Sequence, residues 1–241
     1  LDLQAIADAI TPRTKIVVVN SPHNPTGRIY SRSDLQQLAD LLEEKSAEIG
    51  RRIWILSDEP YRRIRFDGIG FTTPAVVYPH TLIDYSFGKI LLAPGLRIGY
   101  LAISPTLPAS EREELRELRF AVQMADGWNV PDAPLIYAIP DLNAVSIDMA
   151  ALARRRERML GALGQWGYKM TKPEGTFYLW GRAPGGDSAA FAEYLQQSGV
   201  YVMPGTVFDR PTDFRLCLTA TDEMIENSLP AFQLAAEQFP D

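Results

Sequence analysis

Short apolar runs alternate with helical patterns over about the first 105 residues. Between the first two runs, leucines recur at helical spacing after Ser31, an N-cap residue with Asp34 three positions on, and Gly50 closes the segment. Strands that alternate with helices form parallel βαβ units, so we expect a mainly parallel sheet in an α/β fold. The four runs expected to be strands are Ile16 to Asn20, Ile53 to Ser57, Thr81 to Ser86 and Arg97 to Ile103.

The first two runs, "IVVVN" and "IWILSD", are apolar on both faces until a polar residue ends each. This pattern is typical of central strands that helices cover on both sides. In open α/β sheets, ligands bind beyond the carboxyl ends of the strands. We therefore expect the polar residues at those ends to carry chemistry: Asn20 to Asn24, Asp58, and Ser86 to Lys89.

Charged helical patterns replace this alternation after residue 105. They run from Ala109 to Gln123 and from Ser146 to Trp166, with a proline-rich break from Val130 to Pro140 between them. From Tyr168 onward the pattern predicts a small α+β layer with three antiparallel strands. Its expected strands and helices are Phe177 to Trp180, Val200 to Met203, Phe214 to Thr219, Ser188 to Gln197 and Glu223 to Gln238. We accordingly expect one domain in residues 1–143 and a smaller one, with the helix that leads into it, in residues 144–241.

Composition narrows the function. With 241 residues, 46% of them hydrophobic, the chain can bury a sizeable core, and its formal charge of −6 offers no basic field for nucleic acid or an anionic membrane. We therefore expect a small-molecule partner. The single Cys217 rules out an internal disulfide, and two histidines, His23 and His80, do not build a metal site by themselves. No membrane-length apolar run or secretion signal is visible, so we expect a cytoplasmic protein. The chain opens at Leu1 inside a helical pattern, which suggests the later part of a longer chain.

Lys89 lies where the third run ends in a glycine-containing turn. A lysine among apolar residues loses hydration, which favours the neutral amine that attacks aldehydes; a single lysine in a turn is, however, more often a surface residue. Asp58 could pair with a protonated ring nitrogen, a cation or a metal, or could cap a turn. Tyr61 could present its hydroxyl on the same side or pack as an aromatic with a solvated tip.

Three further residues could bind polar groups. Asn24, held between prolines in "NSPHNPTG", offers a directed amide, although this segment is also a turn by composition alone. Ser86 and Arg97 could bind a phosphate through a hydroxyl and a charged fork, while each alone is more often a turn hydroxyl or a surface ion pair.

The order of these elements resembles a known family. "NPTG", then "SDEPY", then "SFGK" followed by "GLRIGY" resemble the class I/II aminotransferases, the fold type I enzymes that use pyridoxal 5′-phosphate (PLP). The resemblance continues through "KPEGTFYLW", "VYVMPGTVF" and "DFRLCLTAT", and so covers essentially the whole chain. It implies an aspartate aminotransferase-like fold: part of a three-layer α/β/α large domain, plus a small C-terminal α+β domain.

The resemblance also implies a role for each matching residue. Lys89 would form the Schiff base with PLP and move the proton during ping-pong transfer of an amino group from an L-amino acid to a 2-oxo acid. Asp58 would keep the ring nitrogen protonated, and Asn24 and Tyr61 would hydrogen-bond the phenolic oxygen of the ring. Ser86 and Arg97 would bind the phosphate. Arg215 would form a fork with the substrate carboxylate, beside Asn24. The resemblance implies a homodimer and no metal.

Some features depart from the family pattern. Gly88 stands before the lysine where many members have serine. The resemblance places the start of the chain well inside the large domain, without the glycine- or serine-rich turn that cradles the phosphate, the aromatic residue that stacks on the ring, or the first strands of the sheet. We expect an unpaired sheet edge and an uncovered core as a result.

Two other functions stay open. His23 in "PHNPTG" is also found in PLP-dependent cysteine-S-conjugate β-lyases, although Tyr61 and "GLRIGY" favour transamination. The chain could also be a non-catalytic fragment that acts as a binding module. The sequence assigns neither the amino acid nor the oxo acid.

Overall fold

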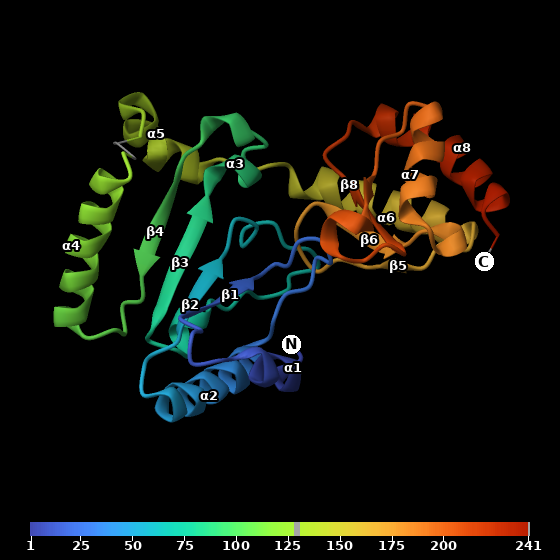
Figure 1. Cartoon of the computed structure of the whole chain (residues 1–241). Helices are drawn as coiled ribbons and strands as arrows, with labels where there is room; N and C mark the ends of the chain where they lie inside the picture. Colours follow the sequence, from blue (N-terminus) through green and yellow to red (C-terminus); the bar gives the residue numbers. More distant parts are fainter. Residues whose placement is uncertain (128–130, 241) are drawn as a thin grey trace. The chain divides into compact units, whose positions relative to one another are not determined.

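The chain divides into two compact units (Figure 1). The computed structural model describes residues 1–127 and 131–240. Two short segments of the N-terminal half, Pro22–Ile29 and Ile64–Ile69, belong with the C-terminal residues from Asp148 onward and form the second unit; the rest of the chain forms the first. The assignment of residues 1–143 and 144–241 to the two domains of a complete fold stays a prediction.

A four-stranded sheet organises the first unit. Its strands are β1 (Ile16–Asn20), β2 (Trp54–Asp58), β3 (Thr81–Ser86) and β4 (Gly99–Ile103), in the order β1-β2-β3-β4. β1, β2 and β3 are parallel, as predicted, and their starts and ends lie within one residue of the predicted ones.

The last strand is the exception in this mainly parallel sheet, because β4 pairs antiparallel with β3. The connection between them folds into the short helix α3 (Phe87–Ile90) and a 3₁₀ turn, η2 (Pro94–Leu96). Its two ends meet, since the Phe87 N–H donates to the Ile98 carbonyl at 3.1 Å. The chain therefore re-enters the sheet at the end it left, which only an antiparallel strand can do.

Helices α1 (Leu3–Ala9) and α2 (Arg32–Ile49) cover one face of the sheet (Figure 1). The predicted start of α2 is confirmed by a capping box, in which the Asp34 N–H donates to Ser31 Oγ at 3.1 Å and the Ser31 N–H donates to Asp34 Oδ2 at 2.8 Å. Gly50 ends the helix in the left-handed conformation, with φ of 71°. The buried core beneath α2 is formed by Val19, Leu35, Leu38, Ala39, Leu42, Ile53, Ile55 and Tyr78.

The other face of β1 is open in the described residues, which agrees with the predicted unpaired sheet edge and uncovered core, although the apolar run alone suggested helices on both sides. Val18 is 63% exposed and Ile16 is 49% exposed, whereas Val19 on the opposite face is buried. β1 is the edge strand of this sheet, and no element of the described residues packs on Ile16 and Val18. The apolar run by itself did not distinguish an edge from a central position.

Two helices follow β4. The first, α4 (Ala109–Ala125), agrees with prediction, but the predicted proline-rich break contains a second helix, α5 (Ala133–Ala144), with Pro140 inside it. Val130, where the break was expected to begin, lies outside the described residues. α5 forms because its leucines and isoleucine pack onto the end of β3 against Tyr85 and Phe87, which outweighs the loss of one hydrogen bond at the proline.

The second unit is an α+β layer with a four-stranded antiparallel sheet in the order β5-β6-β8-β7. The strand predicted over Val200 to Met203 is reduced to the two residues of β7, and β5 was not predicted. Aromatic rings from α7, α8 and β8 meet in its core. Its elements are α6 (Met149–Gln165), β5 (Met170–Thr171), β6 (Tyr178–Arg182), η3 (Pro184–Gly186), α7 (Ser188–Gln197), β7 (Met203–Pro204), η4 (Gly205–Phe208), β8 (Asp213–Cys217) and α8 (Asp222–Gln238).

Within residues 1–127 and 131–240, no individual helix has the length and apolarity to cross a membrane. Only the bent pair of α5 and α6 meets the length and composition criteria, and only when the two helices are taken together.

Candidate active site

Lys89 lies just beyond the carboxyl end of β3. Ser86 ends the strand and caps α3, accepting a hydrogen bond from the Gly88 N–H at 3.2 Å. A Cβ atom at Gly88 would lie 3.1 Å from Pro94 Cα, which explains why a small residue precedes the lysine. The Lys89 side chain is half-buried, and its Nζ lies 5.9 Å from the ring centroid of Tyr61. The turn thus brings the predicted amine close to the predicted tyrosine.

Asp58 ends β2 between two polar neighbours. The strand register pairs it with Asn20 at the end of β1 and with Asp84 on β3. Asn20 Nδ2 donates to both the Asp58 carbonyl oxygen and its Oδ2, each at 3.0 Å. Burial raises the pKa of Asp58 and Asp84 raises it further, while the Asn20 hydrogen bond and the Lys89 charge act in the opposite direction. Asp58, Tyr61 and Lys89 therefore share one end of the sheet.

Tyr61 follows β2 after one turn and is 3% exposed. The Tyr61 ring is therefore buried near the Lys89 amine, as expected of an aromatic side chain that packs in the core.

Ser86 and Arg97 have different surroundings. Ser86 is half-buried at the cap of α3, whereas Arg97 is exposed, has φ of 49°, and donates from Nη1 to the Pro94 carbonyl at 3.4 Å. Arg97 also lines a groove of about 860 Å³ between β4 and α4. A joint role of Ser86 and Arg97 in binding phosphate stays a prediction.

Asn24 and Arg215 meet in the second unit. Arg215, on β8, donates from Nη1 to Asn24 Oδ1 at 2.8 Å. The Arg215 guanidinium lies 4.1 Å from the ring centroid of Tyr178 and 5.0 Å from that of Phe208. The contacts orient the fork, and the two aromatic rings shield it from part of the solvent. This geometry suits an arginine that binds a carboxylate.

His23 belongs to the turn that carries Asn24. Its Nδ1 lies 2.8 Å from Thr26 Oγ1, and burial lowers the pKa of the imidazole, so the neutral form is favoured at neutral pH. The contact joins His23 to Thr26 within the turn, and it does not distinguish transamination from β-elimination.

Sequence reasoning missed a buried carboxylate beside Asp58. Glu59 is fully buried and accepts hydrogen bonds from Ser57 Oγ at 2.8 Å and Thr73 Oγ1 at 2.5 Å. Arg62 Nη1 lies 3.4 Å from Glu59 Oε2, and the Arg62 guanidinium lies 4.7 Å from the ring centroid of Tyr85. Tyr85 directly precedes Ser86, so these contacts support the strand end that presents Lys89. The position of Glu59 next to Asp58 was the one available signal.

Comparisons with known proteins agree with this arrangement. The family model for aminotransferases of class I and II matches residues 1–232. An aspartate/prephenate aminotransferase of Thermus thermophilus is 32% identical, with 96% of this chain and 59% of that protein aligned. An LL-diaminopimelate aminotransferase of Dehalococcoides mccartyi is 31% identical, with 95% and 58% aligned. The crystal structure of an amino transferase from Eubacterium rectale superposes with a TM-score of 0.90 at 33% identity, over all of this chain and 60% of that one.

The chain thus spans about three-fifths of the length of the relatives it matches. The matched region contains each of the residues singled out above. The chain belongs to the class I and II aminotransferase family.

Proposed function

We propose that this protein is a PLP-dependent aminotransferase that moves an amino group from an L-amino acid to a 2-oxo acid by a ping-pong mechanism. The observation that carries the proposal is the position of Lys89, 5.9 Å from the Tyr61 ring centroid and at the end of the sheet where Asp58 ends β2. A lysine amine, a carboxylate and a phenol at one end of a sheet suit the carbonyl, the ring nitrogen and the ring oxygen of PLP.

The residues of the first unit fit the cofactor by the chemistry of their side chains. Lys89 would supply the amine that holds the cofactor and afterwards the base that moves a proton at the substrate Cα. The Asp58 carboxylate would hold the proton on the ring nitrogen, and Tyr61 would donate to the ring oxygen. Ser86 and Arg97 would bind the phosphate. When bound, PLP acts as the electron sink for the carbanion that forms when the Cα proton leaves.

Asn24 and Arg215, in the second unit, have separate proposed roles. Arg215 binds the α-carboxylate of the substrate through its fork, and Asn24, which already accepts a hydrogen bond from it, orients that fork and contacts the ring oxygen. We further propose that residues 1–143 are part of the PLP-binding large domain, that residues 144–241 form the small domain, and that the protein is a cytoplasmic homodimer.

Cofactor attachment is the first test. The purified chain mixed with PLP should show an absorbance band between about 360 and 430 nm. The band should be lost in Lys89→Ala and kept in Lys15→Ala, which removes an exposed lysine and so controls for reaction of PLP at the surface. If Lys89→Ala retains the band, Lys89 is not the anchor. If the parent chain shows no band, the non-catalytic alternative gains support.

The reaction itself is tested by substrate. L-aspartate and LL-diaminopimelate belong in the panel because relatives carry those names. Formation of a new amino acid only when a 2-oxo acid is present supports transamination. Release of pyruvate and ammonia from cysteine conjugates without an oxo acid would instead identify a β-lyase.

A further inference from the structure

Asn20 is the last residue of β1, opposite Asp58 on β2, and the site as described so far gives it no role. The two residues lie 38 positions apart in sequence, and only the strand register brings them together. The Asn20 Nδ2 atom donates one N–H to the Asp58 carbonyl oxygen and the other to Asp58 Oδ2, both at 3.0 Å. Because both partners are acceptors, the amide nitrogen and not the amide oxygen faces Asp58.

The double contact constrains the Asp58 side chain. The backbone carbonyl fixes the Asn20 amide, and the second N–H then fixes one carboxylate oxygen relative to that backbone. A carboxylate bound in this way keeps one orientation, whereas a free one samples several. Asn20 therefore joins two strand ends at the position where Asp58 projects from the sheet.

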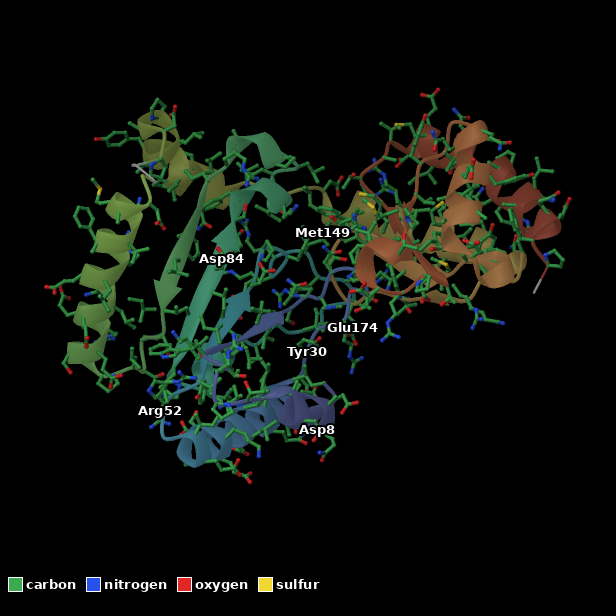
Figure 2. The ribbon with its side chains drawn as sticks, viewed as in Figure 1. Asp8, Tyr30, Arg52, Asp84, Met149 and Glu174 are labelled. Atoms are coloured by element: carbon green, nitrogen blue, oxygen red, sulfur yellow. The ribbon has the colours of Figure 1, made fainter. Side chains whose placement is uncertain are left out.

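The charges around Asp58 make this hydrogen bond important. Asp84, labelled in Figure 2, lies on β3, and the strand register pairs it with Asp58. Glu59 directly follows Asp58, and both of these carboxylates oppose the ionisation of Asp58. Lys89, from α3, is the positive charge that acts to lower the pKa of Asp58, and it is the residue proposed to react. Asn20 supplies a neutral hydrogen-bond donor that favours the anionic form of Asp58. Unlike Lys89, it is not proposed to react.

We propose that Asn20 is a positioning residue for the aminotransferase reaction, holding the Asp58 carboxylate in one orientation and donating the hydrogen bond that its anionic form requires. This inference rests on the proposed function only for the identity of the group that Asp58 receives. The contact between Asn20 and Asp58 exists in the chain without any cofactor, so it can be tested separately.

The direct test is an NMR pH titration of the Asp58 carboxyl carbon in the 241-residue chain, assigned by its loss in Asp58→Asn. Asn20→Leu keeps the branched shape of the side chain but removes the donor, so Asp58 should titrate at higher pH. Asp84→Asn removes a repelling charge, so Asp58 should titrate at lower pH. Asn143→Leu, an exposed position on α5, should leave the titration unchanged.

The opposite directions separate an electrostatic role from a structural one. A merely loosened strand end would move the titration of Asp58 the same way in Asn20→Leu and Asp84→Asn. If Asn20→Leu leaves the titration where it is, or if both variants shift it in one direction, the proposal is overturned. Should Asn20→Leu not fold, Asn20→Ser, which is smaller and polar but too short to reach Asp58, decides the question by the same criterion.

A second measurement connects Asn20 to the cofactor. Titration with PLP, followed by absorbance, should show that Asn20→Leu binds PLP about tenfold or more weakly, the worth of one hydrogen bond to a charged group. If the parent chain binds no PLP, the proposed function fails while the carboxyl titration still decides the role of Asn20. If the parent binds PLP and Asn20→Leu binds it equally well, the positioning role fails while the function stands.

Discussion

Glu59 provides a stringent test of the packing beneath the proposed site, because it is a charged side chain with no exposed surface. Its carboxylate accepts two hydroxyl hydrogen bonds, from Ser57 at 2.8 Å and Thr73 at 2.5 Å, and faces the Arg62 guanidinium at 3.4 Å. Replacing Glu59 with alanine leaves two hydroxyls and a guanidinium without their shared partner. We expect this change to weaken the β2 end of the first unit.

The magnitude can be worked out in two ways. Two hydrogen bonds to a charged acceptor, at about 1.5–3 kcal/mol each, give a loss of about 3–6 kcal/mol. Breaking a buried ion pair by removing one partner costs about 3–5 kcal/mol, and the partial exposure of Arg62 favours the lower half of that range. We therefore expect Glu59→Ala to cost about 3–4 kcal/mol. Glu59→Gln keeps the shape and one acceptor oxygen, with hydrogen bonds about half as strong, and should cost about 1–3 kcal/mol.

Amide hydrogen exchange measured by mass spectrometry is the suitable assay, because it reports peptides of β2 separately and needs no single unfolding transition for the two units. A loss of 3–4 kcal/mol corresponds to exchange on the order of several hundredfold faster in the peptide over β2. Glu113→Ala is the matched control, since its ion pair with Arg116 lies in the solvent with both side chains 63% exposed. Equal exchange rates in Glu59→Ala and Glu113→Ala would refute the reasoning.

Three further changes concern the second unit. Arg215→Lys keeps the charge but loses the fork, so kcat/KM for the amino donor should fall about 10–100-fold, mainly through KM. Gly27→Ala should cost about 2–5 kcal/mol in urea unfolding, because φ is 72° and the new Cβ would lie only 2.3 Å from Pro173 Cβ. The Arg156 hydrogen bond lowers the pKa of Asp67. Ionised Asp67 therefore stabilises the unit at pH values above the usual pKa of aspartate, and this contribution is lost as pH falls through the lowered pKa. Asp67→Asn should therefore lower Tm near pH 7 and flatten the fall in Tm below about pH 4.

Each of these predictions has a matched control. Arg182→Lys, an exposed position on β6, should leave kcat/KM unchanged. Gly50→Ala has the same positive φ with open space around it, so it should cost less than Gly27→Ala; equal costs would show that the close contact is not responsible. Asp209→Asn changes an exposed carboxylate that does not pair with Arg156, so the fall in Tm at acid pH should be the same as in the parent. If Tm falls equally at acid pH in Asp67→Asn and in the parent, the assigned role of Asp67 is contradicted.

Local sequence features predicted those parts of the fold that local physics decides. The ends of α2 follow from Ser31, Asp34 and Gly50, because capping depends on residues a few positions apart. The direction of β4 could not be predicted in this way, since an apolar run has the same pattern in a parallel and an antiparallel strand. The helix α5 was missed because Pro140 suggests a break, whereas packing of α5 against β3 outweighs that preference.

In the candidate site, too, some residues could be predicted from local sequence and others depend on distant contacts. Lys89, Asp58 and Tyr61 were predicted because each follows a strand that the pattern identifies, and parallel neighbours place their carboxyl ends together. Asn20 was expected at a strand end but given no specific role, and Glu59 was not predicted at all, because their partners are distant in sequence. Asn20 contacts Asp58 across 38 residues, and Glu59 accepts from a hydroxyl 14 residues away. Glu59 also contradicts the general rule that glutamate is exposed. Because burial, Asp84, Asn20, Lys89 and Glu59 act together on the pKa of Asp58, the sequence motif identifies the candidate residues, while the sheet register determines which groups surround Asp58.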